Sequence, residues 1–215
     1  MDNTEVETVA YNQPREWLWW TLATAGGWLL GSLGNFAISI VLSMTGLNAA
    51  LNVDPTQIDQ STMLLFMGVS LVMLLIIGLA VGALQWLILR RHIPGINRWA
   101  LFTGLGFALG SFIFLAFMGL GVGVTQWLLL RRDLNKTGWW PVMNAVAWPL
   151  GYIAGGSLGA ALGSALNSPV LGGLVGAALT GVIIGAVTGA VLLWMLRENR
   201  ALLDGLRKDL ETVQA

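Results

Sequence analysis

Long apolar segments separated by short polar ones run through almost the whole chain. They predict six helices, at about 15–44, 63–89, 99–113, 117–130, 139–165 and 170–196. Four of them exceed the roughly 20 apolar residues that a helix needs to cross a bilayer, and the two central ones fall short. The pattern predicts an all-α, polytopic bundle of about six transmembrane helices, the central pair forming a short hairpin.

The clearest motif is an internal repeat. Residues 78–91, GLAVGALQWLILRR, return as residues 119–132, GLGVGVTQWLLLRR. Each copy runs from glycines four residues apart, through a Gln-Trp pair, into an arginine pair. This order is typical of a helix that reaches the cytoplasmic membrane interface, where indoles lie at headgroup level and arginines meet phosphates. The predicted interface residues are Trp86, Arg90, Arg91, Trp127, Arg131 and Arg132.

A degraded third copy spans residues 185–197, GAVTGAVLLWMLR. It keeps the spaced glycines, Trp194 and one arginine, and it lacks the glutamine and the second arginine. The transmembrane domain, residues 15–197, is therefore predicted to consist of degenerate repeats.

The distribution of charge predicts the topology. The loop between the first two helices holds Asp54 and Asp59 and neither lysine nor arginine, which places it outside the cytoplasm by the positive-inside rule. The basic segments 90–98 and 131–138 are expected on the cytoplasmic side. Both termini are expected there as well, so that all 11 Lys and Arg residues share one side.

The segments that precede and follow the transmembrane domain in the sequence carry charge. Residues 1–14 are acidic and lack a signal-peptide pattern, so we expect a retained cytoplasmic segment. Residues 198–215 predict a charged amphipathic helix with an apolar stripe at Leu203, Leu206, Leu210 and Val213. This helix either extends the last membrane helix along the surface or docks a partner.

Residues 99–130 allow two interpretations. A compact hairpin, turning near residues 114–116, keeps every basic cluster on one side but gives arms of roughly 21 to 24 Å against a hydrocarbon core of about 30 Å. One long tilted helix would move Arg131, Arg132 and Lys136 to the opposite side. The charge rule favours the hairpin.

Glycines recur at four-residue spacing in the last two helices, at positions 151, 155, 159 and 163 and again at 181, 185 and 189. Such spacing lets backbones approach closely in a membrane. We expect Gly151, Gly155, Gly159, Gly163, Gly181, Gly185 and Gly189 to form a seam between these helices; the alternative is a face for self-association.

Composition supports the membrane assignment. Hydrophobic residues make up 56% of the chain and charged residues 10%, whereas soluble domains carry about 25% charged residues. The net charge of zero offers no field to recruit nucleic acid. Cysteine is absent, which excludes thiol chemistry.

Tryptophans gather near the basic residues. Nine of the 11 lie within five residues of a lysine or arginine, and only Trp28 and Trp148 fall deeper. A one-sided interfacial belt explains this distribution. A platform for a flat chlorin or carotenoid is the alternative.

Candidate chemistry is sparse. The one histidine, His92, is expected to be an interfacial loop residue, with axial ligation of a chlorin as the alternative. Gln85 and Gln126 lie about one turn inside the membrane face, where burial demands hydrogen-bond partners. We expect them to bond to each other or to the carbonyls of a neighbouring helix, and a ligand contact is the alternative. No catalytic group, metal site or required cofactor is predicted, and the chain is not expected to be an enzyme.

The motif GxxxGxxQWLxLRR, followed by one or two tryptophans, resembles tandem-repeat membrane proteins of cyanobacteria and other filamentous phototrophs. The resemblance covers residues 78–148 well and 139–197 fairly. It implies an array of short glycine-rich hairpins joined by basic turns, and it implies no activity.

Three functions remain open for a protein of a bacterial cytoplasmic or thylakoid membrane. The first is a non-enzymatic accessory or scaffold subunit that packs against other membrane protein subunits and lipids. The second is a neutral-solute or lipid-handling protein. The third is a pigment-binding photosynthetic accessory subunit.

Overall fold

The computed structural model describes residues 13–113 and 118–205 except 45–58. Several predictions fall on the remaining residues: the acidic N-terminal segment up to residue 12, the loop with Asp54, the turn near 114–116, and the tail from Leu206 onward. They lie outside the described residues.

Six helices make up most of the described part, and residues 200–205 are helical as well. The six helices are α1 (Gln13–Met44), α3 (Gln60–Leu89), α4 (Trp99–Ile113), α5 (Met118–Asp133), α6 (Trp139–Ala165) and α7 (Pro169–Glu198). Four of them, α1, α3, α6 and α7, are long and apolar enough to cross a membrane. The segment 99–130 holds two helices that pack together, not one long helix: a Cβ on Gly110 would lie 2.7 Å from the Met118 Cα.

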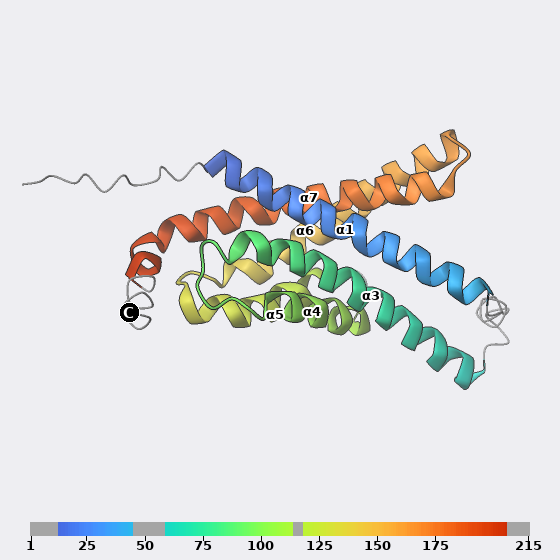
Figure 1. Ribbon diagram of the computed structural model, residues 1–215, viewed down its shortest axis with the longest axis horizontal. Coiled ribbons are helices and arrows are strands. Elements are labelled where there is room, and N and C mark those ends of the chain that lie inside the picture. The colour runs from blue at the N-terminus through green and yellow to red at the C-terminus, as the bar shows by residue number, and fades with distance from the viewer. Residues whose placement is uncertain (1–12, 45–58, 114–117, 206–215) are drawn as a thin grey trace, which may run out of the picture.

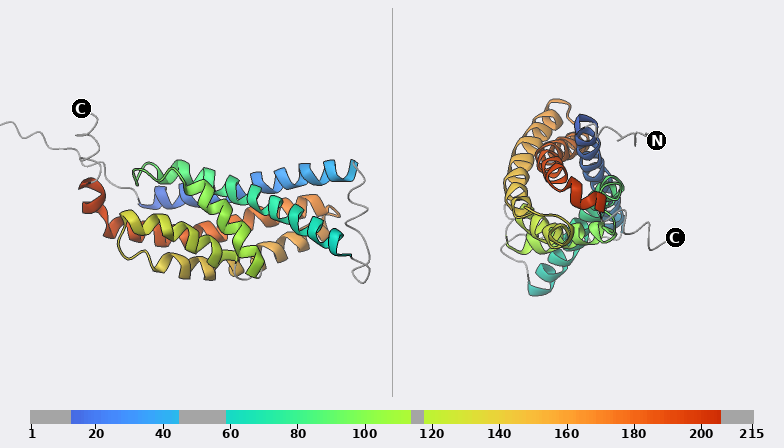
Figure 2. Two further views of the ribbon diagram at one scale, coloured as in Figure 1. Left: turned by 90° about the horizontal axis from the view of Figure 1, so that it is seen from below. Right: turned by 90° about the vertical axis from the view of Figure 1, so that its left-hand side faces the viewer.

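The helices form a ring (Figure 2, right). Each packs against the next one in the chain, and α7 packs against α1, so that the last helix closes on the first. One side of each helix therefore faces the ring axis, and the other faces outward.

Unequal helix lengths give the two ends of the ring different shapes. Helices α4 and α5 have 15 and 16 residues, whereas the other four have 27 to 32. At about 1.5 Å per residue, the α4–α5 hairpin has roughly half the length of its neighbours. All six helices therefore share one half of the molecule, and beyond it α1–α3 and α6–α7 continue as two separate arms (Figure 1).

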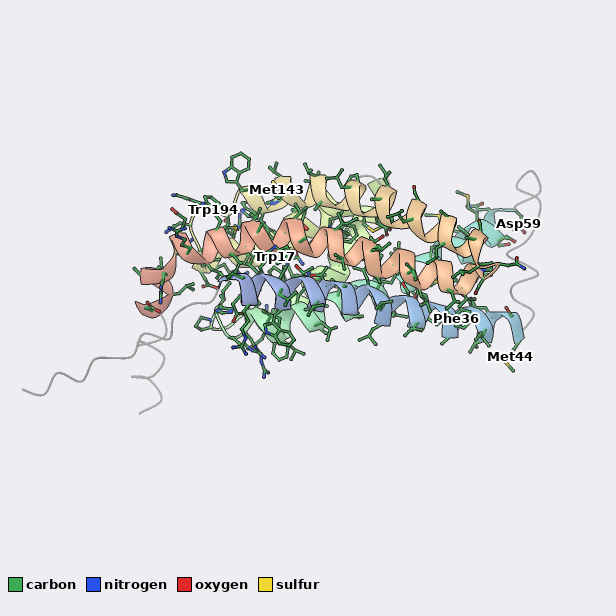
Figure 3. The ribbon with its side chains drawn as sticks, turned by 90° about the horizontal axis from the view of Figure 1, so that it is seen from above. Trp17, Phe36, Met44, Asp59, Met143 and Trp194 are labelled. Carbon is green, nitrogen blue, oxygen red and sulfur yellow. The ribbon has the colours of Figure 1, made fainter. Side chains whose placement is uncertain are left out.

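The two ends also differ in side chains. Trp17, Met143 and Trp194 lie toward one end, and Phe36, Met44 and Asp59 toward the other (Figure 3). The end with Trp17 also holds the arginine pairs that end α3 and α5 and both ends of the described chain (Figure 1).

Asp59 caps the first turn of α3 at the opposite end. Its carboxylate accepts hydrogen bonds from the Thr62 backbone N–H at 2.7 Å and the Ser61 hydroxyl at 2.9 Å. Hydrogen bonds from Thr62 and Ser61 hold the pKa of Asp59 below its ordinary value, because they favour the charged form. The cap satisfies a backbone donor that the helix itself leaves unpaired.

The glycines of α6 pack as predicted, but with other residues of α7. A Cβ on Gly155 would lie 2.5 Å from the Thr180 backbone N, and one on Gly159 would lie 2.6 Å from the Gly176 Cα. All four α6 glycines are buried against this face, which consists of Gly172, Gly176, Thr180 and Ile184.

The partner predicted for Gly181, Gly185 and Gly189 is wrong. These glycines pack on α1: a Cβ on Gly181 would lie 2.6 Å from the Ala25 Cα, and one on Gly185 would lie 2.9 Å from the Thr21 Cα. Thr180 and Gly181 differ by one residue, which is about 100° around a helix. Helix α7 therefore carries two small-residue faces, one for α6 and one for α1.

Candidate functional site: a polar layer on the ring axis

Gln85 lies inside the ring and joins three helices. Its Nε2 donates to the Thr24 Oγ1 on α1 at 3.0 Å, and its Oε1 accepts from the Trp99 Nε1 on α4 at 3.1 Å. Gln85 is 4% exposed, and Thr24 and Trp99 are fully buried. The side-chain amide thus satisfies donors and acceptors that would otherwise be unpaired in an apolar core.

Gln126 makes the same contacts 41 residues later. Its Nε2 donates to the Thr103 Oγ1 at 2.9 Å, and its Oε1 accepts from the Trp140 Nε1 at 2.9 Å. Its Nε2 also lies 3.4 Å from the Gln85 Oε1, so the two glutamines touch. The predicted contact between the two glutamines is therefore present, and their other hydrogen-bond partners are side chains, not backbone carbonyls.

A third set of contacts joins the first helix of the chain to the last. The Trp20 Nε1 on α1 donates to the Thr188 Oγ1 on α7 at 3.1 Å. Thr188 follows Gly185 by three residues, as Gln85 follows Gly82 and Gln126 follows Gly123. Matching Gly185 and Gly189 to Gly78 and Gly82 hides this correspondence, because Leu192 then takes the place of the glutamine.

Helices α1, α4 and α6 share a second pattern. A tryptophan is followed after four residues by a polar side chain that bonds back to its carbonyl: Thr24 to Trp20 at 2.9 Å, Thr103 to Trp99 at 2.8 Å, and Asn144 to Trp140 at 2.9 Å. After four more residues comes an aromatic ring. The pattern W-x-x-x-[TN]-x-x-x-[WF] was present in the sequence and would have identified these residues.

The three tryptophans meet on the ring axis. Ring centroids of Trp20, Trp99 and Trp140 are 6.0 to 6.2 Å apart in edge-to-face pairs. Each is at most 1% exposed. Their assignment to an interfacial belt is therefore wrong, because their N–H groups bond inside the ring to Gln85, Gln126 and Thr188.

A second aromatic layer lies on the other side of the polar residues. Trp28, Phe107 and Trp148 have ring centroids 4.6 to 5.8 Å apart. Between the layers lies a cavity of about 10 Å³, bordered by Gln85, Gln126, Thr24, Thr103, Asn144 and Thr188. This volume is about that of one water-sized probe.

The predicted interface residues form pairs on the surface of the ring. The Arg90 Cζ lies 4.8 Å from the centroid of the Trp86 ring, and the Arg131 Cζ lies 4.7 Å from that of Trp127. Arg91 and Arg132 are also exposed at this end. Such pairs are cation–π contacts, and their contact with lipid phosphates stays a prediction.

Other polar contacts tie the chain ends to the basic loops. His92 lies with its Nε2 3.1 Å from the Glu16 Oε2, so the one histidine pairs α1 with the loop after α3. The Asn199 side chain accepts from the Asn135 N–H at 2.7 Å and donates to the Asn135 carbonyl at 3.1 Å. In the described part of the chain, no three His, Asp or Glu side chains are grouped so that they could hold a metal.

Comparison with known proteins gives no match, whether with protein-family models, curated proteins or solved structures. The fold by itself defines the class. Four long apolar helices mark an integral membrane protein, and the particular feature of this one is a buried polar layer repeated around a ring.

Proposed function

We propose that the chain is a non-enzymatic membrane protein that serves as an accessory or scaffold subunit for a larger membrane complex. The observation that carries the proposal is the use of Gln85 and Gln126. The amide nitrogen of each glutamine donates to a side chain of one neighbouring helix, and its amide oxygen accepts from a side chain of the other. Polar groups buried in a membrane often mark transport or catalytic sites. The amides of Gln85 and Gln126 instead make hydrogen bonds that hold the ring together.

The repeated contacts support a common origin for the three parts of the ring. We propose that α3–α4, α5–α6 and α7–α1 are three degenerate hairpin units, the last one split between the two ends of the chain. Such a ring is closed without any added subunit. Its outer surface is therefore available to a partner helix or to lipids.

The tryptophan layer across the ring axis favours this role over passage of a neutral solute. A solute would have to cross the Trp20, Trp99 and Trp140 layer, where no ring is more than 1% exposed. The proposed location is a bacterial cytoplasmic or thylakoid membrane, with the basic end in the cytoplasm because lysine and arginine accumulate there.

Mild detergent extraction of the tagged protein from its native membrane tests the proposal. We expect it to migrate with other membrane proteins as a species larger than the free chain, without visible absorbance. The matched variant Gln126→Met, which removes the bonds to Thr103 and Trp140, is expected to lose those proteins along with thermal stability. A stable, colourless single chain would contradict the scaffold role, and a bound chromophore would favour a pigment-binding subunit.

A further inference from the structure

A groove opens where the α4–α5 hairpin ends and the two longer arms continue. Its volume is about 640 Å³, within the range of small-molecule sites. The inner faces of α6 and α7 form its floor, from Tyr152 to the turn at Asn167, and Trp28 of α1 stands at its closed end. Its floor follows two helices that are candidate membrane spans, so lipid is the medium around it.

The lining is made of small and aromatic residues. It contains glycine, alanine, serine, threonine, asparagine and proline besides Trp28 and Tyr152, and no charged side chain. A Cβ on Gly156 or on Gly173 would meet no atom within 4 Å. These glycines leave space that the protein itself does not fill, and an uncharged molecule suits it.

The closed end carries hydrogen-bond donors without adequate acceptors. Trp28 is only 4% exposed, and its buried Nε1 has no hydrogen-bond partner. The Tyr152 hydroxyl has a single contact, the Met118 sulfur at 3.9 Å, and thioether sulfur is a weak acceptor. The two rings lie 5.4 Å apart, edge to face.

Trp148 has the hydrogen-bond acceptor that Trp28 lacks. The Trp148 Nε1 donates to the Asn144 Oδ1, one turn before it, at 3.3 Å. The residue one turn before Trp28 is Thr24, whose hydroxyl already accepts from Gln85 and donates to the Trp20 carbonyl. A buried donor without a partner is costly in an apolar medium, so a bound acceptor would stabilise this position.

We propose that the groove binds one uncharged lipid whose long apolar chain lies along the glycine floor and whose carbonyl oxygen lies at the closed end. The carbonyl accepts from Trp28 and Tyr152, and the aromatic rings flank it. The chain runs toward Ser164 and Asn167, where the groove reaches the end of α6. Quinones and keto-lipids share this chemistry. The site does not depend on the scaffold role.

Binding of a long-chain benzoquinone to the purified protein, measured by native mass spectrometry, tests the groove. Gly156→Leu and Gly173→Leu place side chains in its open space and should weaken binding at least about tenfold, because they displace several methylene groups. Gly68→Leu is the matched control, since its Cβ also meets nothing within 4 Å but lies on α3, outside the groove. Equal binding by all three variants, or equal loss in all three, would overturn the proposal.

A second comparison tests the acceptor. Trp28→Phe keeps a ring and removes the N–H, and we expect about three- to tenfold weaker quinone binding with no change for the alkylbenzene that has the same chain. Trp148→Phe, which removes an N–H that is already paired inside the ring, should leave quinone affinity unchanged. If Trp28→Phe binds the quinone as tightly as the unmodified protein, or if the alkylbenzene binds as tightly as the quinone, the carbonyl assignment is wrong.

Discussion

Trp99 donates its indole N–H to the side-chain carbonyl of Gln85 at 3.1 Å, deep inside the ring. The same bond recurs between Trp140 and Gln126, 41 residues along the chain, at 2.9 Å. A tryptophan and a glutamine in adjacent helices are thereby fixed in depth and rotation relative to each other. The glutamine of the repeated motif thus joins one helix to the next.

The first prediction concerns this bond. Gln85→Met keeps the length of the side chain but leaves the Trp99 N–H buried without an acceptor and removes a donor from Thr24. We expect a loss of about 1–3 kcal/mol in the free energy of unfolding, measured in mixed micelles. Gln60→Met, at the exposed start of α3, should change it by less than about 0.5 kcal/mol. Equal stability of the two variants would show that the polar layer contributes nothing.

The second prediction uses neighbouring glycines on α6. A Cβ on Gly155 would lie 2.5 Å from the Thr180 N and 2.9 Å from the Gly176 O, and backbone atoms cannot move aside cheaply. Gly155→Ala should therefore destabilise the protein by about 1–3 kcal/mol. Gly156→Ala meets open space and should be neutral or stabilising, because alanine favours a helix over glycine. Thermal unfolding of both variants in detergent decides the matter; indistinguishable midpoints would mean that α6 and α7 do not need their close approach.

The hydropathy pattern predicted the helices but not their closure into a ring. Hydropathy located α4 at Trp99–Ile113 and α6 at Trp139–Ala165, because each begins at a tryptophan after a polar turn. It did not distinguish between Trp20, which faces the ring axis, and the half-exposed Trp19 beside it. In a membrane, lipid is as apolar as the protein core, so hydrophobicity carries little information on which side of a helix faces inward.

The polar residues would have been a better guide to the site. Gln85 and Gln126 were predicted to need partners, and the structure provides them. Thr188 was missed because threonine satisfies itself within a helix, here by donating to the Ile184 carbonyl, and so gives no signal of its own. Its bond to Trp20 joins residues 168 positions apart, and no local pattern predicts such a pairing.

The third prediction concerns topology. Ser61 lies at the start of α3 and Asn135 in the loop after α5, at opposite ends of the molecule, and both are exposed. With lysine and arginine on the cytoplasmic side, an impermeant thiol reagent should label Ser61→Cys in intact cells and leave Asn135→Cys unlabelled until the membrane is opened. The chain has no native cysteine to interfere. Labelling of Asn135→Cys alone would invert the orientation.

The last prediction returns to the arginine–tryptophan pairs. The Arg131 guanidinium lies 4.7 Å from the Trp127 ring, four residues earlier on the same helix face, and Arg90 and Trp86 repeat the geometry at 4.8 Å. We expect these pairs to fix the depth of α3 and α5 and so to hold the short α4–α5 hairpin between them, for which a bilayer of ordinary thickness is too wide by several Å. A cycle of Trp127→Leu, Arg131→Gln and the double variant should give a coupling of about 0.5–1 kcal/mol, as for exposed cation–π contacts. The losses should grow in the thicker of two bilayers, because mismatch then adds to the lost contact. Additive losses that are the same in both bilayers would mean that the two residues act as independent interfacial side chains.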